Sequence, residues 1–142
     1  MVKNDSPLQR IEDVDRDGVR VAVGRKSAYD LFLTRHLKRA EIIRAPTSPG
    51  AIELFLKDNL DCVAGVKQPL VDFAKSHPGM RVMDGRFMAI EQAVGTPKGR
   101  GEAGARYLRQ FVEEQKASGF VAAALERSGQ ARTLVAPPAS AR

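Results

Sequence analysis

The loop at residues 24–27 brings together groups that could bind an anion. It reads Gly24-Arg25-Lys26-Ser27 and joins a predicted strand to a predicted helix. Backbone N–H groups at the helix start, the helix dipole, the Ser27 hydroxyl and two cationic side chains could all face one carboxylate or phosphate. The loop lacks the Gly-x-x-x-x-Gly-Lys spacing of a Walker phosphate loop. The alternative is a helix capped by Ser27 with Arg25 and Lys26 in solvent, and the residues alone do not separate the two interpretations.

Two further loops follow the next two predicted strands. Thr47 and Ser48 lie at a second helix start, where they could contact a ligand or simply cap the helix and form the turn. Gly65 follows the third strand, with Lys67 and Gln68 after it. A close backbone turn is the alternative interpretation of Gly65. Together the loops offer hydroxyl, amide and ammonium groups to one candidate binding site.

No arrangement of residues in the sequence is typical of an enzyme or a metal site. A nucleophile elbow, an ordered Ser, His and Asp set, and metal-ligand spacing are all missing. Asp84 and Glu91 do not form an acid/base pair, and His36 and His77 stand alone. Cys62 is the only cysteine and sits in an apolar run, which indicates a buried side chain rather than a reactive thiol. We therefore expect no catalytic residue, no metal and no cofactor.

The composition is typical of a globular protein, and the excess of basic residues is compatible with a small anionic ligand. The chain has 142 residues, of which 43% are hydrophobic and 28% charged, and its formal net charge is +6. Basic residues are scattered among acidic ones rather than gathered in a stripe, so we expect no nucleic-acid partner. No apolar run approaches the roughly 20 residues of a membrane helix. Residues 1–6 are polar and lack the pattern of a signal peptide.

Strand and helix patterns alternate along the chain. β-branched apolar runs predict strands, and apolar residues at three- and four-residue spacing predict helices. The expected strands are residues 19–23, 41–45, 61–65, 80–83 and 87–90. The expected helices are residues 27–37, 51–56, 68–76, 102–117 and 120–127. Ser27 and Ser48 are the expected caps of the first two helices, and Pro49 suits the first position of the second.

This alternation predicts an α/β fold with a mostly parallel sheet flanked by helices on both faces. In such sheets ligands bind outside the carboxyl ends of the strands. Because all three candidate loops follow predicted strands, we expect them to lie at one edge of the sheet and to form its binding site.

Several short motifs, in order, resemble one family of proteins. They are Asp17-Gly18-Val19-Arg20-Val21-Ala22-Val23, Ser27-Ala28-Tyr29, Asn59-Leu60-Asp61-Cys62-Val63-Ala64-Gly65, Tyr107-Leu108 with Phe111-Val112, and Ser118-Gly119. With this spacing, residues 10–130 resemble the solute-binding proteins of ABC transporters, of the polar amino acid type (family 3) with the type II periplasmic-binding-protein fold.

The resemblance implies one lobe of a two-lobed clamshell. Residues 1–17 would be a polar lead-in, 18–92 the ligand-binding lobe, 93–130 a return segment with two helices, and 131–142 a flexible tail. The return segment would pack on a first lobe that this chain lacks, and residues 87–95 resemble the strand that crosses back to it. We therefore expect a homodimer, or an exchange of segments, to cover the apolar faces that remain.

The resemblance also implies a function and the residues that perform it. Such proteins bind a small polar solute, an amino acid or carboxylated organic anion, in the periplasm and deliver it to a permease. The hydroxyl and backbone N–H of Ser27 match the family's carboxylate-binding position. Lys26 stands where the family usually has Gly, and Gly65 where it often has the Asp that binds an α-amino group. The remaining expected ligand-binding residues are Arg25, Ala28, Thr47, Ser48 and Gln92.

Three alternatives to transport are carried forward. Some relatives on this scaffold are similar to cyclohexadienyl dehydratases, which need a general acid or base in the cleft. Others use the same clamshell as a sensory or effector domain that reports ligand to a signalling module. Nucleic-acid binding is the third alternative, and it would show a steep dependence on salt.

Overall fold

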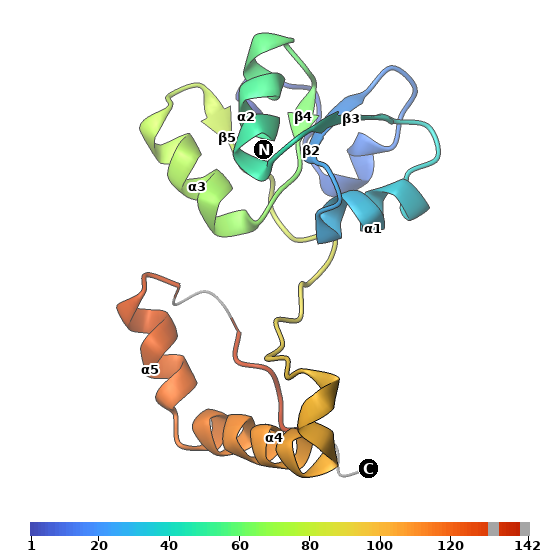
Figure 1. Cartoon of the computed structure of the whole chain (residues 1–142). Coiled ribbons are helices and arrows are strands. Elements are labelled where there is room, and N and C mark those ends of the chain that lie inside the picture. The colour runs from blue at the N-terminus through green and yellow to red at the C-terminus, as the bar shows by residue number, and fades with distance from the viewer. Residues whose placement is uncertain (131–133, 140–142) are drawn as a thin grey trace. The chain divides into compact units, whose positions relative to one another are not determined.

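The computed structural model describes residues 1–130 and 134–139, and the chain divides into two compact units, Met1–Ile90 and Glu91–Arg142 (Figure 1). The first unit contains the alternating strands and helices, and the second contains the two C-terminal helices. The α/β fold predicted from the sequence is confirmed in the first unit.

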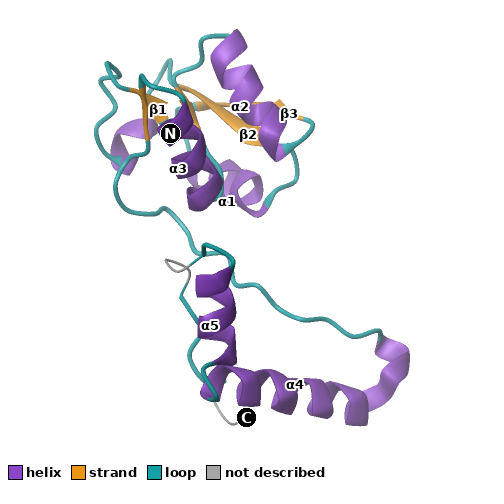
Figure 2. Cartoon of the chain, turned by 90° about the vertical axis from the view of Figure 1, so that its left-hand side faces the viewer, coloured by secondary structure: helices purple, strands orange, loops and turns teal. Residues whose placement is uncertain are grey.

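A parallel three-stranded sheet forms the centre of the first unit. Its strands are β2 (Arg20–Gly24), β3 (Glu41–Ala45) and β4 (Cys62–Val63), in the order β3-β2-β4. Helix α1 (Ala28–His36) connects β2 to β3, and α2 (Ser48–Lys57) connects β3 to β4. Because β3 and β4 flank β2 on opposite sides, right-handed crossovers place the two helices on opposite faces. Figure 2 shows β2 and β3 between α1 and α2.

Each face of this sheet has its own cluster of buried side chains. Val21 and Val23 of β2 lie in the cluster that contains α1. Ala22 lies in the other cluster, with Phe55 of α2 and part of α3 (Lys67–Ser76). This alternation is the two-residue period of a strand, and burial on both faces explains why the strand is apolar throughout.

Residues 1–17, which the sequence set apart as a polar lead-in, belong to the first unit and contribute to its core. Val2 and Leu8 are 0% and 3% exposed. Strand β1 (Val2–Lys3) pairs antiparallel with β5 (Met80–Arg81) in a second, two-stranded sheet. A few apolar residues among many charged ones give no periodic pattern, so the sequence offered little signal for this packing.

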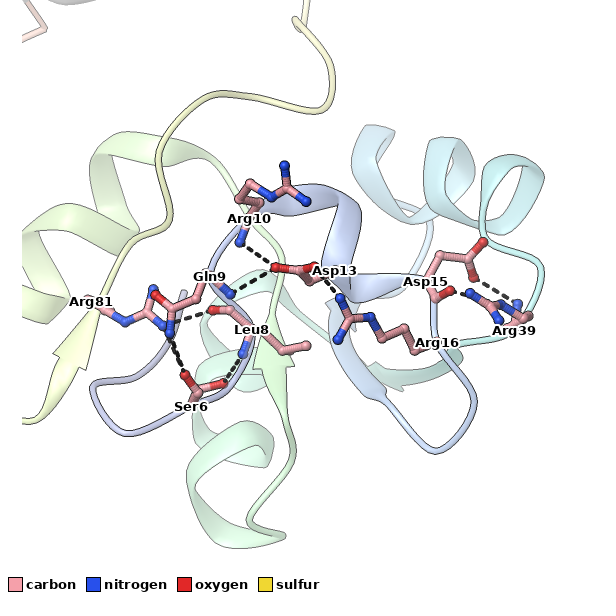
Figure 3. A network of polar contacts seen from close by, with 9 residues as sticks. All are labelled: Ser6, Leu8, Gln9, Arg10, Asp13, Asp15, Arg16, Arg39 and Arg81. Carbon is pink, nitrogen blue, oxygen red and sulfur yellow. Dashed lines mark hydrogen bonds and ion pairs between the residues drawn. The ribbon is translucent and has the colours of Figure 1, made fainter.

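Two carboxylates fasten this N-terminal segment through backbone hydrogen bonds (Figure 3). Asp13, in the 3₁₀ helix η1 (Ile11–Val14), accepts the N–H groups of Gln9 and Arg10 at 3.1 and 2.9 Å. Asp15 Oδ1 accepts three consecutive N–H groups at 2.8–3.1 Å, from Lys38, Arg39 and Ala40. These bonds to the ionised form lower the pKa of both carboxyl groups.

The predicted strands at residues 80–83 and 87–90 are corrected by the structure. Only Met80–Arg81 forms a strand, and the described residues 87–90 form none. Phe87 and Met88 instead pack against the buried cluster on the α1 face. Their apolar character therefore reflects burial of side chains by an irregular segment, which a short run cannot distinguish from a strand.

The second unit contains the two predicted helices with closely similar bounds. They are α4 (Gly101–Ala117) and α5 (Phe120–Arg127), after the 3₁₀ turn η2 (Lys98–Arg100). Gly119, with φ of +79°, lies between α4 and α5 in a conformation that favours glycine. None of the residues described in this unit is buried. Among the helices that the structure describes, none is both long enough and apolar enough to cross a membrane.

The expected flexible tail lies partly outside the described residues, because 131–133 and 140–142 are not described. The described residues 134–139 have no regular secondary structure. They run beside α4, where Lys116 Nζ donates to the carbonyl oxygen of Pro137 at 2.8 Å. The N–H of Ala139 donates to Glu113 Oε2 at 3.2 Å.

Candidate functional site

The loops after β2, β3 and β4 follow the carboxyl ends of three adjacent parallel strands. Since β2 is the central strand, its loop lies between the other two. Helices α1 and α3, which follow β2 and β4, contribute to buried clusters on opposite faces of the sheet. Two neighbouring strands, β2 and β4, are thus followed by helices on opposite faces of the sheet. This arrangement is the topological switch point at which open α/β sheets bind ligands. This edge is therefore the candidate site.

The loop after β2 presents one hydroxyl group and two cations. Ser27 is the cap of α1, and its Oγ accepts the N–H of Asp30 at 3.1 Å. The capping interpretation of Ser27 is thus confirmed, but the hydroxyl still has its own hydrogen to donate. Arg25 and Lys26 are exposed, while the Arg25 N–H donates to the carbonyl oxygen of Ala45 at 2.8 Å. That bond ties the β2 loop to the end of β3.

The side chain of Asp30 stabilises the conformation of the loop after β2. Its side chain is only 5% exposed. Oδ2 accepts the Lys26 N–H at 2.8 Å, and Oδ1 accepts Arg44 Nε at 2.9 Å. Arg44 also donates to Thr34 Oγ1 at 2.8 Å, and this hydroxyl donates to the Asp30 carbonyl oxygen. The positive charge of the Arg44 guanidinium compensates the negative charge of the buried Asp30 carboxylate. The exposed charge of the loop is therefore the positive charge of Arg25 and Lys26.

The loop after β3 adds two more hydroxyl groups. Thr47 is the cap of α2, with Oγ1 accepting the N–H of Gly50 at 3.0 Å. The prediction that Ser48 caps this helix is wrong, since Ser48 is its first residue and Pro49 its second. Threonine provides the same side-chain acceptor as serine, and proline fits the first turn at either position. Ser48 Oγ instead accepts the Tyr29 hydroxyl at 2.6 Å.

The loop after β4 is the least polar of the three. Gly65 is partly buried, and a Cβ there would meet only the Leu70 side chain, at 3.5 Å. Val66 precedes α3 without a side-chain cap. Lys67, the first residue of α3, is exposed, whereas the Gln68 amide donates to a carboxylate within the same helix. Lys67 is therefore the group that this loop offers to an anion.

Most of the predicted ligand-binding residues lie at this edge of the first unit. The loops after β2 and β3 carry six of them, Arg25, Lys26, Ser27, Ala28, Thr47 and Ser48, and Gly65 follows β4. Gln92 is an exposed residue of the second unit, so the structure does not assign it to this edge.

Sequence reasoning missed three residues that support the site, namely Tyr29, Asp30 and Arg44. The spacing of Asp30, three residues after Ser27, is that of a helix-capping pair and could have signalled its role. Tyr29 and Arg44 act through contacts between elements, for which one sequence gives no signal.

The cysteine and the two histidines of the chain take part in packing. Cys62 is 3% exposed, and burial raises the pKa of its thiol to about 12. The His36 ring stacks on Phe32, and the His77 ring on Phe73, each with 3.8 Å between centroids. Within the described parts of the chain, no three His, Cys, Asp or Glu side chains are grouped so as to hold a metal ion.

Comparison with known proteins adds no assignment. No protein-family model matches the chain, and neither the curated proteins nor the solved structures compared with it give a significant match.

Proposed function

We propose that the first unit binds a small carboxylated solute at the carboxyl edge of its parallel sheet. The observation that carries the proposal is that three hydroxyl groups in these loops act as hydrogen-bond acceptors. Ser27 and Thr47 each accept a backbone N–H, and Ser48 accepts the Tyr29 hydroxyl. Each of the three therefore keeps an O–H hydrogen that can be donated to a carboxylate oxygen.

The charge of the loops supports an anion as the ligand. The segments 24–28, 45–48 and 64–67 contain Arg25, Lys26 and Lys67 and no acidic residue. The buried carboxylate of Asp30, which accepts the Lys26 N–H of this loop, is already paired with Arg44. An α-ammonium group would therefore lack a negative partner in these loops, which favours an organic anion over a zwitterionic amino acid.

The arrangement of strands supports a lobe of the type II periplasmic-binding-protein fold as the scaffold. The first parallel strand is central, the next two flank it, and helices cover both faces. With the family resemblance of residues 10–130, this leads us to propose the substrate-binding component of an ABC transporter. A periplasmic location and a permease partner belong to the same proposal.

Calorimetric titration of the chain with succinate, citrate, glutamate and glutamine tests the proposal. We expect weak, saturable binding of the organic acids, of roughly millimolar affinity because one lobe supplies only part of an enclosing site. Ser27→Gly removes the hydroxyl at a position where glycine is tolerated as a helix cap, and should weaken binding about tenfold. Lys26→Ala should weaken it by a similar factor.

Lys57→Ala is the matched control, because Lys57 lies in the last turn of α2, away from the carboxyl edge. It should bind like the unsubstituted chain. No saturable heat with any acid, or equal losses in Lys57→Ala and Lys26→Ala, would contradict the proposal. Turnover of prephenate or arogenate, tested alongside, would instead support the dehydratase alternative.

A further inference from the structure

The chain contains two Asp-Gly bonds, and both lie in the first unit with all four residues exposed. They are Asp17-Gly18 and Asp84-Gly85. Such a bond can rearrange, because the side-chain carboxyl carbon can close a five-membered ring with the next backbone nitrogen. Glycine favours this closure, since it has no Cβ to hinder the approach. Because the two dipeptides are identical, a difference in their reactivity has to arise from their surroundings.

The Asp17-Gly18 bond lies in a hydrogen-bonded turn. The Val19 N–H donates to the Arg16 carbonyl oxygen at 3.2 Å, and Gly18 has φ of +81°. A glycine with positive φ at the third position is typical of a type II turn, in which the torsion ψ of the second residue is about +120°. That torsion turns the Gly18 nitrogen away from the Asp17 side chain. Ring closure at Asp17 therefore requires the turn to open and its hydrogen bond to break.

The Asp84-Gly85 bond is not held by a turn of this kind. Among the described residues, no backbone hydrogen bond closes a turn around Asp84 and Gly85. A Cβ on Gly85 would meet only the Cδ1 atom of Ile11, at 3.4 Å. The torsion between Asp84 and Gly85 can therefore rotate toward ring closure without the loss of a hydrogen bond.

We propose that Asp84 is a modification site at which the chain forms isoaspartate, and that this modification releases the packed segment after it. In the first step the Gly85 nitrogen bonds to Asp84 Cγ, and the carboxyl hydroxyl leaves with the proton of that nitrogen as water. In the second step water adds to the main-chain carbonyl carbon of the resulting succinimide and breaks its bond to the Gly85 nitrogen. The chain then continues through Cβ and Cγ of residue 84, with a carboxylate on Cα. Both steps use only the chain and water.

Isoaspartate lengthens the main chain by one carbon atom shortly before two packed residues. Phe87 and Met88 pack against the buried cluster on the α1 face. The Phe87 ring centroid lies 5.8 Å from that of Phe32, which belongs to α1. A main chain of different length at residue 84 displaces these side chains from positions that depend on close packing. We therefore expect the Phe87 ring to move away from Phe32 in the modified chain.

Peptide mapping of the full chain, aged at mildly acidic pH below its unfolding temperature, tests the site. We expect isoaspartate to accumulate at residue 84 roughly threefold to tenfold faster than at residue 17, the rate factor that corresponds to one intramolecular hydrogen bond. In concentrated urea, where the turn is lost, the difference should fall below about twofold.

Two matched variants identify the signals. Asp84→Glu keeps the charge but would need a six-membered ring, so the signal at residue 84 should disappear while that at residue 17 stays unchanged. Asp17→Glu should have the reverse effect.

Proton NMR of the aged chain tests the release of the segment. Contacts between the ring protons of Phe32 and Phe87 should disappear in the fraction modified at residue 84 and persist in aged Asp84→Glu. Equal rates at residues 17 and 84 in the folded chain, or a difference that persists in urea, would overturn the proposal. Ring contacts that persist in the modified fraction would also overturn it.

Discussion

The backbone of Gly24 lies against Ser48, so closely that a Cβ at residue 24 would be 2.9 Å from the Cα, N and Oγ atoms of Ser48. This approach joins the end of the central strand to the start of α2 at the candidate site. We expect Gly24→Ala to lower the free energy of unfolding by roughly 1–3 kcal/mol, because backbone atoms must shift to admit the methyl group. Chemical denaturation followed by circular dichroism measures the loss.

Gly65→Ala is the matched control for this prediction. Its Cβ would make only ordinary contact with the Leu70 side chain, at 3.5 Å. We expect a change within about 0.5 kcal/mol. Equal losses in the two variants would show that the approach of Gly24 to Ser48 has no special role.

Lys26 adopts a left-handed backbone conformation, with φ of +61°. Glycine adopts this conformation without steric cost, so Lys26→Gly should raise the free energy of unfolding by about 0.5–1 kcal/mol while it weakens anion binding. Arg25→Gly is the control, because it removes a neighbouring charge at a residue whose φ is not positive. Glycine there adds freedom to the unfolded chain and relieves no strain, so the free energy of unfolding should fall. A fall in stability for both variants would contradict the strain that we assign to Lys26.

Asp30 and Arg44 form a pair whose carboxylate is buried and whose guanidinium is partly exposed. Asp30→Asn should destabilise the first unit by roughly 1–3 kcal/mol, because the Lys26 N–H and the guanidinium lose a charged acceptor. Asp72→Asn disrupts an exposed pair with Lys75 and should cost less than about 0.5 kcal/mol. A double-mutant cycle with Arg44→Met isolates the coupling between Asp30 and Arg44.

The network around Asp15 predicts a dependence of stability on pH. Backbone hydrogen bonds from residues 38–40 lower the pKa of Asp15 in the folded state below its ordinary value of 3.8. The stabilisation is therefore complete above pH 3.8 and is lost as the pH falls from there through the lowered pKa. Asp15→Asn should flatten the acid-unfolding curve in this range, and Asp58→Asn, an exposed control, should leave it unchanged.

Much of the fold could be predicted from the sequence, because its signals are local. The apolar run at residues 19–23 and the helical spacing after Ser27 correspond to β2 and α1. The buried positions of Val2 and Leu8 could not be predicted, since each depends on packing with residues distant in sequence. Thr47 and Ser48 are neighbours in sequence, so the sequence predicts that they share a loop. The Tyr29–Ser48 contact joins residues that are distant in sequence, and no local pattern predicts it.

Backbone amide NMR of the chain, titrated with succinate and then with glutamine, tests the central claim most directly. The proposal predicts saturable shifts with succinate at residues 25–29, 47–50 and 66–67, and smaller shifts with glutamine. The same residues should shift little in Ser27→Gly. Saturable shifts centred elsewhere in the first unit, or none with either compound, would contradict an anion-binding site at the carboxyl edge of the sheet.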